Sequence, residues 1–200
     1  MRSFLETYGT AVAGLALALF FVVFAPNFAA PNNLLNVLKE TSFLAILAIG
    51  FTLALITSEL DLSVAEVASL AAVVTGALIQ AGQSPLLAVA AGLVVALGAG
   101  LFNGIAVTRL KVPSLIATLG MAAIAKGFAF MITQGVAFVG RWPTQFTGIA
   151  RGSLFGIPNL VLWLAIVAGA ALFLVKCTRT GVHMTATGEA DSASSSAGIP

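Results

Sequence analysis

Charged residues are absent from four long stretches of this sequence, residues 9–25, 41–58, 67–108 and 152–175. A helix needs about 17 to 25 predominantly apolar residues to cross the hydrocarbon layer of a membrane. Residues 67–108 are numerous enough for two crossings, and Gly82 and Pro85 mark a turn between them. Only 8% of the residues are charged and 60% are hydrophobic, whereas about a quarter are charged in a soluble domain. The sequence therefore predicts an all-α integral membrane protein, a polytopic helical bundle.

Six membrane-spanning segments are predicted, at residues 9–26, 40–58, 63–81, 86–107, 114–133 and 158–176. Lys126 interrupts the fifth segment, and its side chain is expected to extend to the membrane interface; a partner inside the bundle is the alternative. Because Lys and Arg are enriched in cytoplasmic loops, their positions favour a cytoplasmic N-terminus. In that orientation the cytoplasmic cations are Arg2, Arg109, Lys111, Lys176 and Arg179, and the external ones are Lys39, Arg141 and Arg151.

The composition also argues against several functions. The net charge of +2 is spread between apolar segments with no basic stripe, so nucleic-acid binding is not expected. Cys177 is the single cysteine, which excludes an intrachain disulfide, and no Cys/His spacing indicates a metal site. His183 is the only histidine, and neither a catalytic constellation nor a glycine-rich phosphate loop is visible. We expect a non-catalytic subunit without a cofactor, whose nucleotide chemistry, if it drives active transport, lies on another subunit.

Small residues recur at every fourth position of the fourth predicted segment. This spacing keeps them on one slowly drifting face of a helix, where a neighbouring helix can approach closely. The sequence therefore predicts a helix-packing face inside the bundle, a feature common to membrane proteins of every function. Its members are Ala88, Gly92, Ala96, Gly100 and Gly104.

The turn between the second and third predicted segments holds three of the seven acidic residues, Glu59, Asp61 and Glu66. Carboxylates so close to hydrocarbon are costly unless they reach water, a cavity or a partner. One interpretation is helix capping, in which Asp61 or Ser63 caps the third helix and Glu66 completes a capping box with Ser63. The other is a direct role in a translocation path, and the two can coexist.

Several short motifs resemble one family when they are taken in order. Residues 33–36, Asn-Leu-Leu-Asn, are similar to the motif Asn-Leu-x-Asn that precedes the second helix of this family. Residues 59–64, Glu-Leu-Asp-Leu-Ser-Val, resemble the signature Gly-Ile-Asp-Leu-Ser-Val. Asn103-Gly104 followed by residues 112–120, Val-Pro-Ser-Leu-Ile-Ala-Thr-Leu-Gly, matches a second signature, and Gly156-Ile157-Pro158 fits a third. The chain thus resembles the ribose/xylose/galactoside-type permeases of bacterial ABC importers, whose relatives include autoinducer-2 and branched-chain amino-acid permeases.

Residues 177–200 contain mainly Ser, Thr, Ala and Gly and in isolation suggest a flexible tail. The family resemblance implies instead a cytoplasmic coupling loop that docks on an ATPase subunit, following a transmembrane permease region at residues 1–176. The ATPase contacts implied are Gly188, Ala193, Gly198 and Ile199. The chain departs from the family pattern at Ser58-Glu59, Ala65, Val182, Glu189-Ala190 and Ser194, several of which replace glycine.

The resemblance implies a subunit of an importer for a sugar or sugar-like solute in the bacterial inner membrane. Its implied partners are an ABC ATPase, a periplasmic solute-binding protein and a second permease copy, in a homodimer or a heterodimer. Asp61, Ser63 and Asn103 are the residues expected in the path or gate. The family has about ten membrane helices, so this chain is expected to be its N-terminal part, apparently truncated. An ion-coupled secondary carrier using Glu59, Asp61, Glu66 and Lys126, or a truncated nonfunctional paralogue, is the alternative.

Overall fold

The structure is a computed structural model that describes residues 2–139 and 142–189, with side chains from residue 8 onward. Its contacts divide the chain into two units, residues 1–42 and 43–200, and each unit is described by itself. The helices are α1 (Arg2–Phe24), α2 (Pro31–Ile56), α3 (Val64–Gln80), α4 (Pro85–Thr108), α5 (Ser114–Thr133), α6 (Thr144–Arg151), α7 (Asn159–Cys177) and α8 (Arg179–Glu189), and the strands are β1 (Ser153–Leu154) and β2 (Ile157–Pro158).

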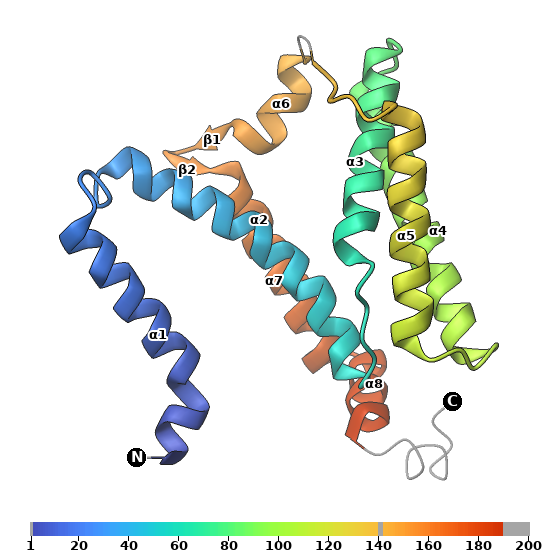
Figure 1. Cartoon of the computed structure of the whole chain (residues 1–200), viewed down its shortest axis with the longest axis horizontal. Coiled ribbons are helices and arrows are strands. Elements are labelled where there is room, and N and C mark those ends of the chain that lie inside the picture. Colours follow the sequence, from blue (N-terminus) through green and yellow to red (C-terminus); the bar gives the residue numbers. More distant parts are fainter. Residues whose placement is uncertain (1, 140–141, 190–200) are drawn as a thin grey trace. The chain divides into compact units, whose positions relative to one another are not determined.

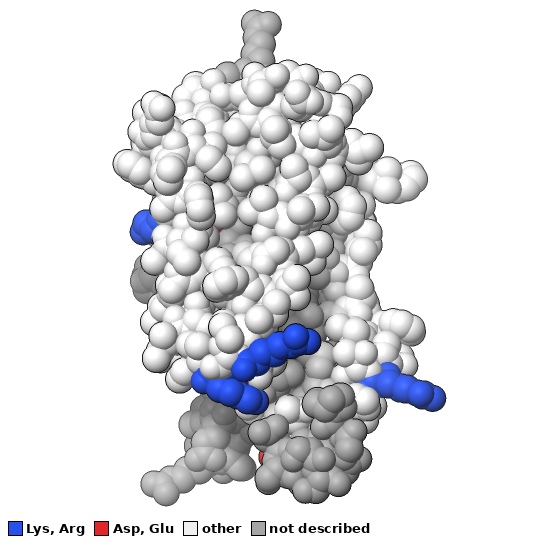
Figure 2. Space-filling model, turned by 90° about the vertical axis from the view of Figure 1, so that its right-hand side faces the viewer, with Lys and Arg blue, Asp and Glu red and all other residues white. Residues whose placement is uncertain are grey.

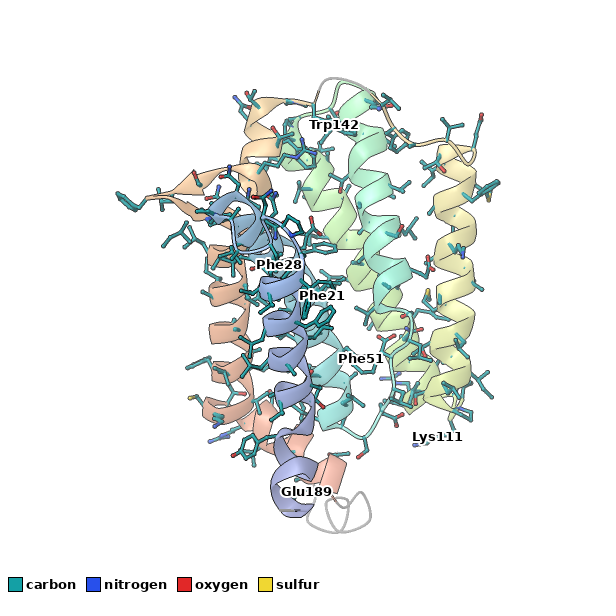
Figure 3. The ribbon with its side chains drawn as sticks, turned by 60° about the vertical axis from the view of Figure 1, so that its left-hand side comes forward. Phe21, Phe28, Phe51, Lys111, Trp142 and Glu189 are labelled. Carbon is teal, nitrogen blue, oxygen red and sulfur yellow. The ribbon has the colours of Figure 1, made fainter. Side chains whose placement is uncertain are left out.

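The first unit holds α1 and the beginning of α2, joined by a short turn. Aromatic side chains gather where the chain reverses: the rings of Phe21 and Phe28 stack with their centroids 5.5 Å apart (Figure 3). Asn33 Nδ2 donates a hydrogen bond of 2.8 Å to the Phe28 carbonyl, and Asn27 adopts a positive φ of 63°. These contacts form the turn and begin α2 at Pro31, nine residues before the predicted segment.

The second unit is organised around α3, α4 and α5, which pack against one another (Figure 1). Ala88 and Gly92 of α4 are buried against α3. A Cβ added to Gly92 would collide with the Thr75 hydroxyl and lie 2.7 Å from the Ala71 carbonyl oxygen. The Thr75 hydroxyl donates hydrogen bonds to the carbonyls of Ala71 and Ala88, at 2.8 and 3.3 Å. Gly92 thus permits a close approach of two helix backbones, which is how small residues favour helix association in a membrane.

Replacing Gly92 with leucine is expected to lower the free energy of unfolding by about 1–3 kcal/mol, because the larger side chain separates α3 from α4. Titration of the purified chain from mild detergent into sodium dodecyl sulfate measures this change. Gly104→Leu is the matched control: it lies on the same helix, and nothing comes within 4 Å of its added Cβ. Equal losses in the two variants would contradict the packing account.

The remaining elements of the second unit form a second group of contacts. The hairpin of β1 and β2 leads from α6 into α7, which packs against α6 and α8. Asn159 Nδ2 donates to the Gly148 carbonyl at 2.7 Å, and Trp163 Nε1 donates to the Ile149 carbonyl at 3.1 Å, so two side chains of α7 hold the end of α6. At the other end of α7, the Thr178 hydroxyl accepts a hydrogen bond of 3.1 Å from Gly181 N and caps α8.

The prediction of an all-α polytopic membrane protein is confirmed. Four helices are long and apolar enough to cross a membrane: α2, α4, α5 and α7. Two shorter apolar helices, Tyr8–Phe24 and Val64–Gln80, correspond to the first and third predicted segments. Lys126 does not interrupt α5, and its side chain is exposed. The sequence reasoning missed α6 and the hairpin, and composition alone wrongly suggested a flexible tail where α8 forms over Arg179–Glu189.

Candidate functional site

The expected path residues lie around a non-helical segment, residues 57–63, between α2 and α3. α2 ends at Ile56, Ser58 has a positive φ of 60°, and α3 begins at Val64. Backbone without helical hydrogen bonds is tolerated at membrane depth only where it is buried in protein or lines a cavity. We call residues 57–63 the connecting segment; side chains of α4 and α5 and a backbone carbonyl of α8 hold it.

Asp61, Ser63 and Asn103 are brought together, as a hydrogen-bonded chain. Asp61 Oδ1 accepts from Ser63 N at 2.9 Å and from Ser63 Oγ at 2.6 Å. Ser63 Oγ in turn accepts from Asn103 Nδ2 of α4 at 3.0 Å. Ser63 is 1% exposed and Asn103 6% exposed, so the chain links the start of α3 to the interior face of α4.

The predicted capping box is wrong. Ser63 occupies the N-cap position of α3, but its backbone is already in the right-handed helical region and its side chain makes no cap hydrogen bond. A capping serine must turn its oxygen toward the free amides of the first turn. Here that oxygen is engaged by Asp61 and Asn103 instead. Asp61 accepts from the amide two residues further on, which is an Asx turn before the helix.

Two hydroxyls of α5 hold the middle of the connecting segment. Leu60 N donates to Ser114 Oγ at 3.4 Å, and Thr118 Oγ1 donates to the Leu60 carbonyl at 3.3 Å. The sequence reasoning did not select Ser114 or Thr118 as site residues. Both lie within the Val-Pro-Ser-Leu-Ile-Ala-Thr motif, in which the two hydroxyls are one helical turn apart and share a face.

The end of α8 holds the other end of the connecting segment. Ser58 Oγ donates a hydrogen bond of 2.7 Å to the Gly188 carbonyl. A Cβ added to Gly188 would collide with the Ile56 carbonyl oxygen and lie 3.3 Å from Thr57 Cα. Gly188, expected to contact an ATPase, therefore packs on the backbone that follows α2. The other residues expected there, Ala193, Gly198 and Ile199, lie outside the described residues.

The connecting segment borders a pocket of about 260 Å³. Glu59 and Asp61 line it and are half-buried; Asn103 also lines it, and its buried Oδ1 atom has no hydrogen-bond partner among the described residues. The pocket is lined by Ala54, Thr57, Glu59, Leu60, Asp61, Gly100, Asn103, Gly104, Val107, Thr108, Ser114 and Thr118. In the described part of the chain, no three His, Cys, Asp or Glu side chains come together as metal ligands.

The small residues of α4 divide between two environments. Ala88 and Gly92 are buried against α3, and Ala96 is partly buried. Gly100 and Gly104 are exposed and line the pocket instead. A four-residue repeat turns by about 40° at each step because a helix has 3.6 residues per turn. The last two glycines have therefore rotated away from the α3 contact.

Charge and aromatic side chains differ between the ends of the second unit. Lys111 and Glu189 lie at the end that holds the connecting segment and α8, and Trp142 lies at the opposite end (Figure 3). Most of the Lys and Arg visible on the α4–α5 face gather at its lower end, beneath a largely uncharged surface (Figure 2). This distribution suits helices that cross an apolar layer.

Fold and site together define a multi-pass helical membrane protein with a buried polar connection at one end of its apolar helices. The family model described as "Branched-chain amino acid transport system / permease component" matches residues 33–200. The chain belongs to this family, which confirms the resemblance inferred from the motifs. Family and apolar helices together make it a multi-pass protein of the bacterial inner membrane.

Several curated relatives are about equally similar. The ribose import permease protein RbsC of Escherichia coli (strain K12) is 32% identical over 99% of this chain and 63% of its own length. The L-arabinose ABC transporter permease protein AraH of Azospirillum brasilense is 32% identical over 90% of this chain and 55% of its own length. The autoinducer 2 import system permease protein LsrC of Escherichia coli O9:H4 (strain HS) is 32% identical, with coverages of 94% and 56%. The chain thus spans less than two thirds of these relatives, and no solved structure matches it.

Proposed function

We propose that the chain is a permease subunit of an ABC-type importer, carrying a sugar or sugar-like solute across the bacterial inner membrane with energy from a separate ATPase. The names of the relatives support this proposal, since they are import permeases for ribose and autoinducer 2 and an ABC transporter permease for L-arabinose. A periplasmic solute-binding protein would deliver the solute. A second permease copy, identical or homologous, would complete the membrane path.

The observation that carries the proposal is the contact between Gly188 and the connecting segment. α8 is fixed at its start by the cap of Thr178 and at its end by Ser58. The connecting segment continues to Asn103 on α4 and to Thr118 on α5. A displacement of α8 by a docked ATPase would therefore move hydrogen-bonded residues next to the pocket. In this account, Asp61, Ser63 and Asn103 shape the path or gate and Gly188 joins it to the docking helix.

The proposed orientation places the N-terminus, α8 and Lys111 in the cytoplasm. Arg109 and Lys111 lie in the loop between α4 and α5, and Lys176 ends α7. These cations would thus lie on the cytoplasmic side of the membrane, where Lys and Arg are enriched. Trp142, at the other end of the second unit, would lie at the external interface, where tryptophan is enriched.

Replacing Val182 with aspartate is expected to reduce the amount of ATPase that copurifies with the chain by about tenfold, equivalent to about 1.4 kcal/mol. Val182 is an apolar side chain on α8 that is 60% exposed, and a carboxylate buried at an interface without a partner costs free energy. Affinity purification from membranes that contain the candidate ATPase, followed by quantitative blotting, gives the measurement. Val139→Asp is the control, since Val139 is also exposed but precedes Trp142 at the other end. Recovery of no ATPase with the unmodified chain would contradict the proposed function.

A further inference from the structure

The pocket beside the connecting segment contains a buried acceptor without a donor. Asn103 is 6% exposed and lines the pocket, and its Oδ1 atom has no partner among the described residues. A buried carbonyl oxygen left without a hydrogen bond costs roughly 1–3 kcal/mol in a protein. An unsatisfied group of this kind needs an explanation, and a donor group bound in the pocket is one.

The neighbouring hydrogen bonds fix which way the Asn103 amide faces. Asp61 Oδ1 lies 2.6 Å from Ser63 Oγ, and a carboxylate only accepts hydrogen bonds, so the single hydroxyl proton of Ser63 points to Asp61. Ser63 Oγ can then only accept from Asn103, which requires Nδ2 to face it. Oδ1 is consequently the atom left over, because turning the amide over would place this acceptor against Ser63 Oγ, whose one proton is already donated to Asp61.

Among the described residues, the other polar side chains of the pocket offer one spare donor, the Ser114 hydroxyl, whose oxygen accepts from Leu60 N. The hydroxyls of Thr57, Thr108 and Thr118 donate to the carbonyls of Ala54, Gly104 and Leu60. Glu59 and Asp61 add carboxylates, which accept hydrogen bonds and carry negative charge. No Lys or Arg is among the described residues that line the pocket. A ligand that adds donors and positive charge would therefore complement this lining.

We infer that this pocket binds an organic cation through an ammonium or guanidinium group. Either group presents several donors and a positive charge to Asn103 Oδ1 and the carboxylates of Glu59 and Asp61. A neutral polyol would supply donors but leave the negative charge unbalanced. A zinc site would need three or four His, Cys, Asp or Glu ligands, and no three of these side chains come together in the described part of the chain. The cation could belong to a free amine or to a Lys or Arg side chain of a partner subunit.

A cysteine in the pocket tests the inference on the purified chain. Val107 lines the pocket and valine and cysteine are similar in size, so Val107→Cys is made in a Cys177→Ala background. The rate of modification by the cationic reagent 2-aminoethyl methanethiosulfonate is divided by the rate for the anionic reagent 2-sulfonatoethyl methanethiosulfonate. We call this quotient the reagent ratio. At low salt this ratio is expected to exceed that of Val182→Cys, on the exposed face of α8, by about tenfold. n-Butylammonium should slow the modification, and n-butanol should not.

Glu59→Gln is the variant that removes charge with the smallest risk to folding, since the Glu59 side chain makes no hydrogen bond to another described residue. We expect it to lower the reagent ratio and weaken protection by n-butylammonium about tenfold. The inference would be overturned if the reagent ratio were the same for Val107→Cys and Val182→Cys. It would also be overturned if n-butanol protected Val107→Cys as well as n-butylammonium does. These measurements need neither transport nor an ATPase, so their failure would leave the proposed function standing.

The source of the cation is distinguished in inside-out membrane vesicles that contain the assembled complex. If a partner's Lys or Arg fills the pocket, Val107→Cys should react slowly in the complex and fast in the isolated chain. If a free amine is the ligand, the cysteine should remain reactive in the complex and be protected by n-butylammonium. Fast modification without protection in both preparations would contradict the inference.

Discussion

Replacing Gly188 with valine is expected to lower ATP-driven uptake by about tenfold or more. This effect lies within the range that is typical of energetic coupling between two sites. The new side chain would collide with the Ile56 carbonyl oxygen and lie in tight contact with Thr57 Cα, so the end of α8 must move away from α2. That movement breaks the hydrogen bond from Ser58 to the Gly188 carbonyl. Uptake of labelled solute by membrane vesicles energised with ATP provides the measurement.

Gly169→Val is the matched control for this substitution. Gly169 also lies in a helix of the second unit, but its added Cβ meets no atom within 4 Å. We expect this variant to retain uptake. Copurification of the ATPase should survive in Gly188→Val, because Val182 and the exposed face of α8 are unaltered. Unimpaired uptake by Gly188→Val would show that α8 does not act through the connecting segment.

Removing the Asp61 carboxylate has the largest expected effect on stability. Asp61→Ala deletes the acceptor of two hydrogen bonds from Ser63 and releases the serine that holds Asn103. Hydrogen bonds to charged groups contribute about 1.5–3 kcal/mol, so the free energy of unfolding should fall by about 2–4 kcal/mol. Titration into sodium dodecyl sulfate measures the loss, together with the modification rate of Val107→Cys.

Two comparisons make the Asp61 result specific. Asp61→Asn keeps an acceptor oxygen at the same position and should lose less than half as much stability as Asp61→Ala. Glu66→Gln should change the free energy of unfolding by no more than about 0.5 kcal/mol, because no cap hydrogen bond from Ser63 accompanies it. If Glu66→Gln were as damaging as Asp61→Ala, the capping box would be the better account of this turn.

The membrane helices could be predicted from the sequence because their signal is local. A run of apolar residues long enough to cross hydrocarbon has few alternatives to a helix, since the backbone must satisfy its own hydrogen bonds. The fourth to sixth predicted segments accordingly coincide with α4, α5 and α7 to within one residue at each end. α2 begins much earlier than predicted, because the hydrogen bond from Asn33 to the Phe28 carbonyl forms its first turn, ahead of the apolar run.

The partners of the polar side chains could be predicted only in part. Glu66, three residues after Ser63, predicts that Ser63 caps the helix. Instead, the Ser63 hydroxyl oxygen accepts a hydrogen bond from Asn103, forty residues away. Composition likewise gave no sign of α8, whose position depends on the fit of Gly188 against Ile56. Local patterns specify which residues are available for hydrogen bonding and close packing. Tertiary neighbours decide which of the available contacts form.

ATP-driven uptake by the reconstituted complex tests the proposed function most directly. The chain is purified with the subunits that copurify from its native membrane, placed in proteoliposomes, and supplied with labelled ribose, arabinose or other monosaccharides and the solute-binding protein. The account predicts accumulation of at least one sugar that requires ATP and persists when an ionophore collapses the proton gradient. Uptake that proceeds without ATP and stops when the gradient collapses would contradict it and favour an ion-coupled carrier.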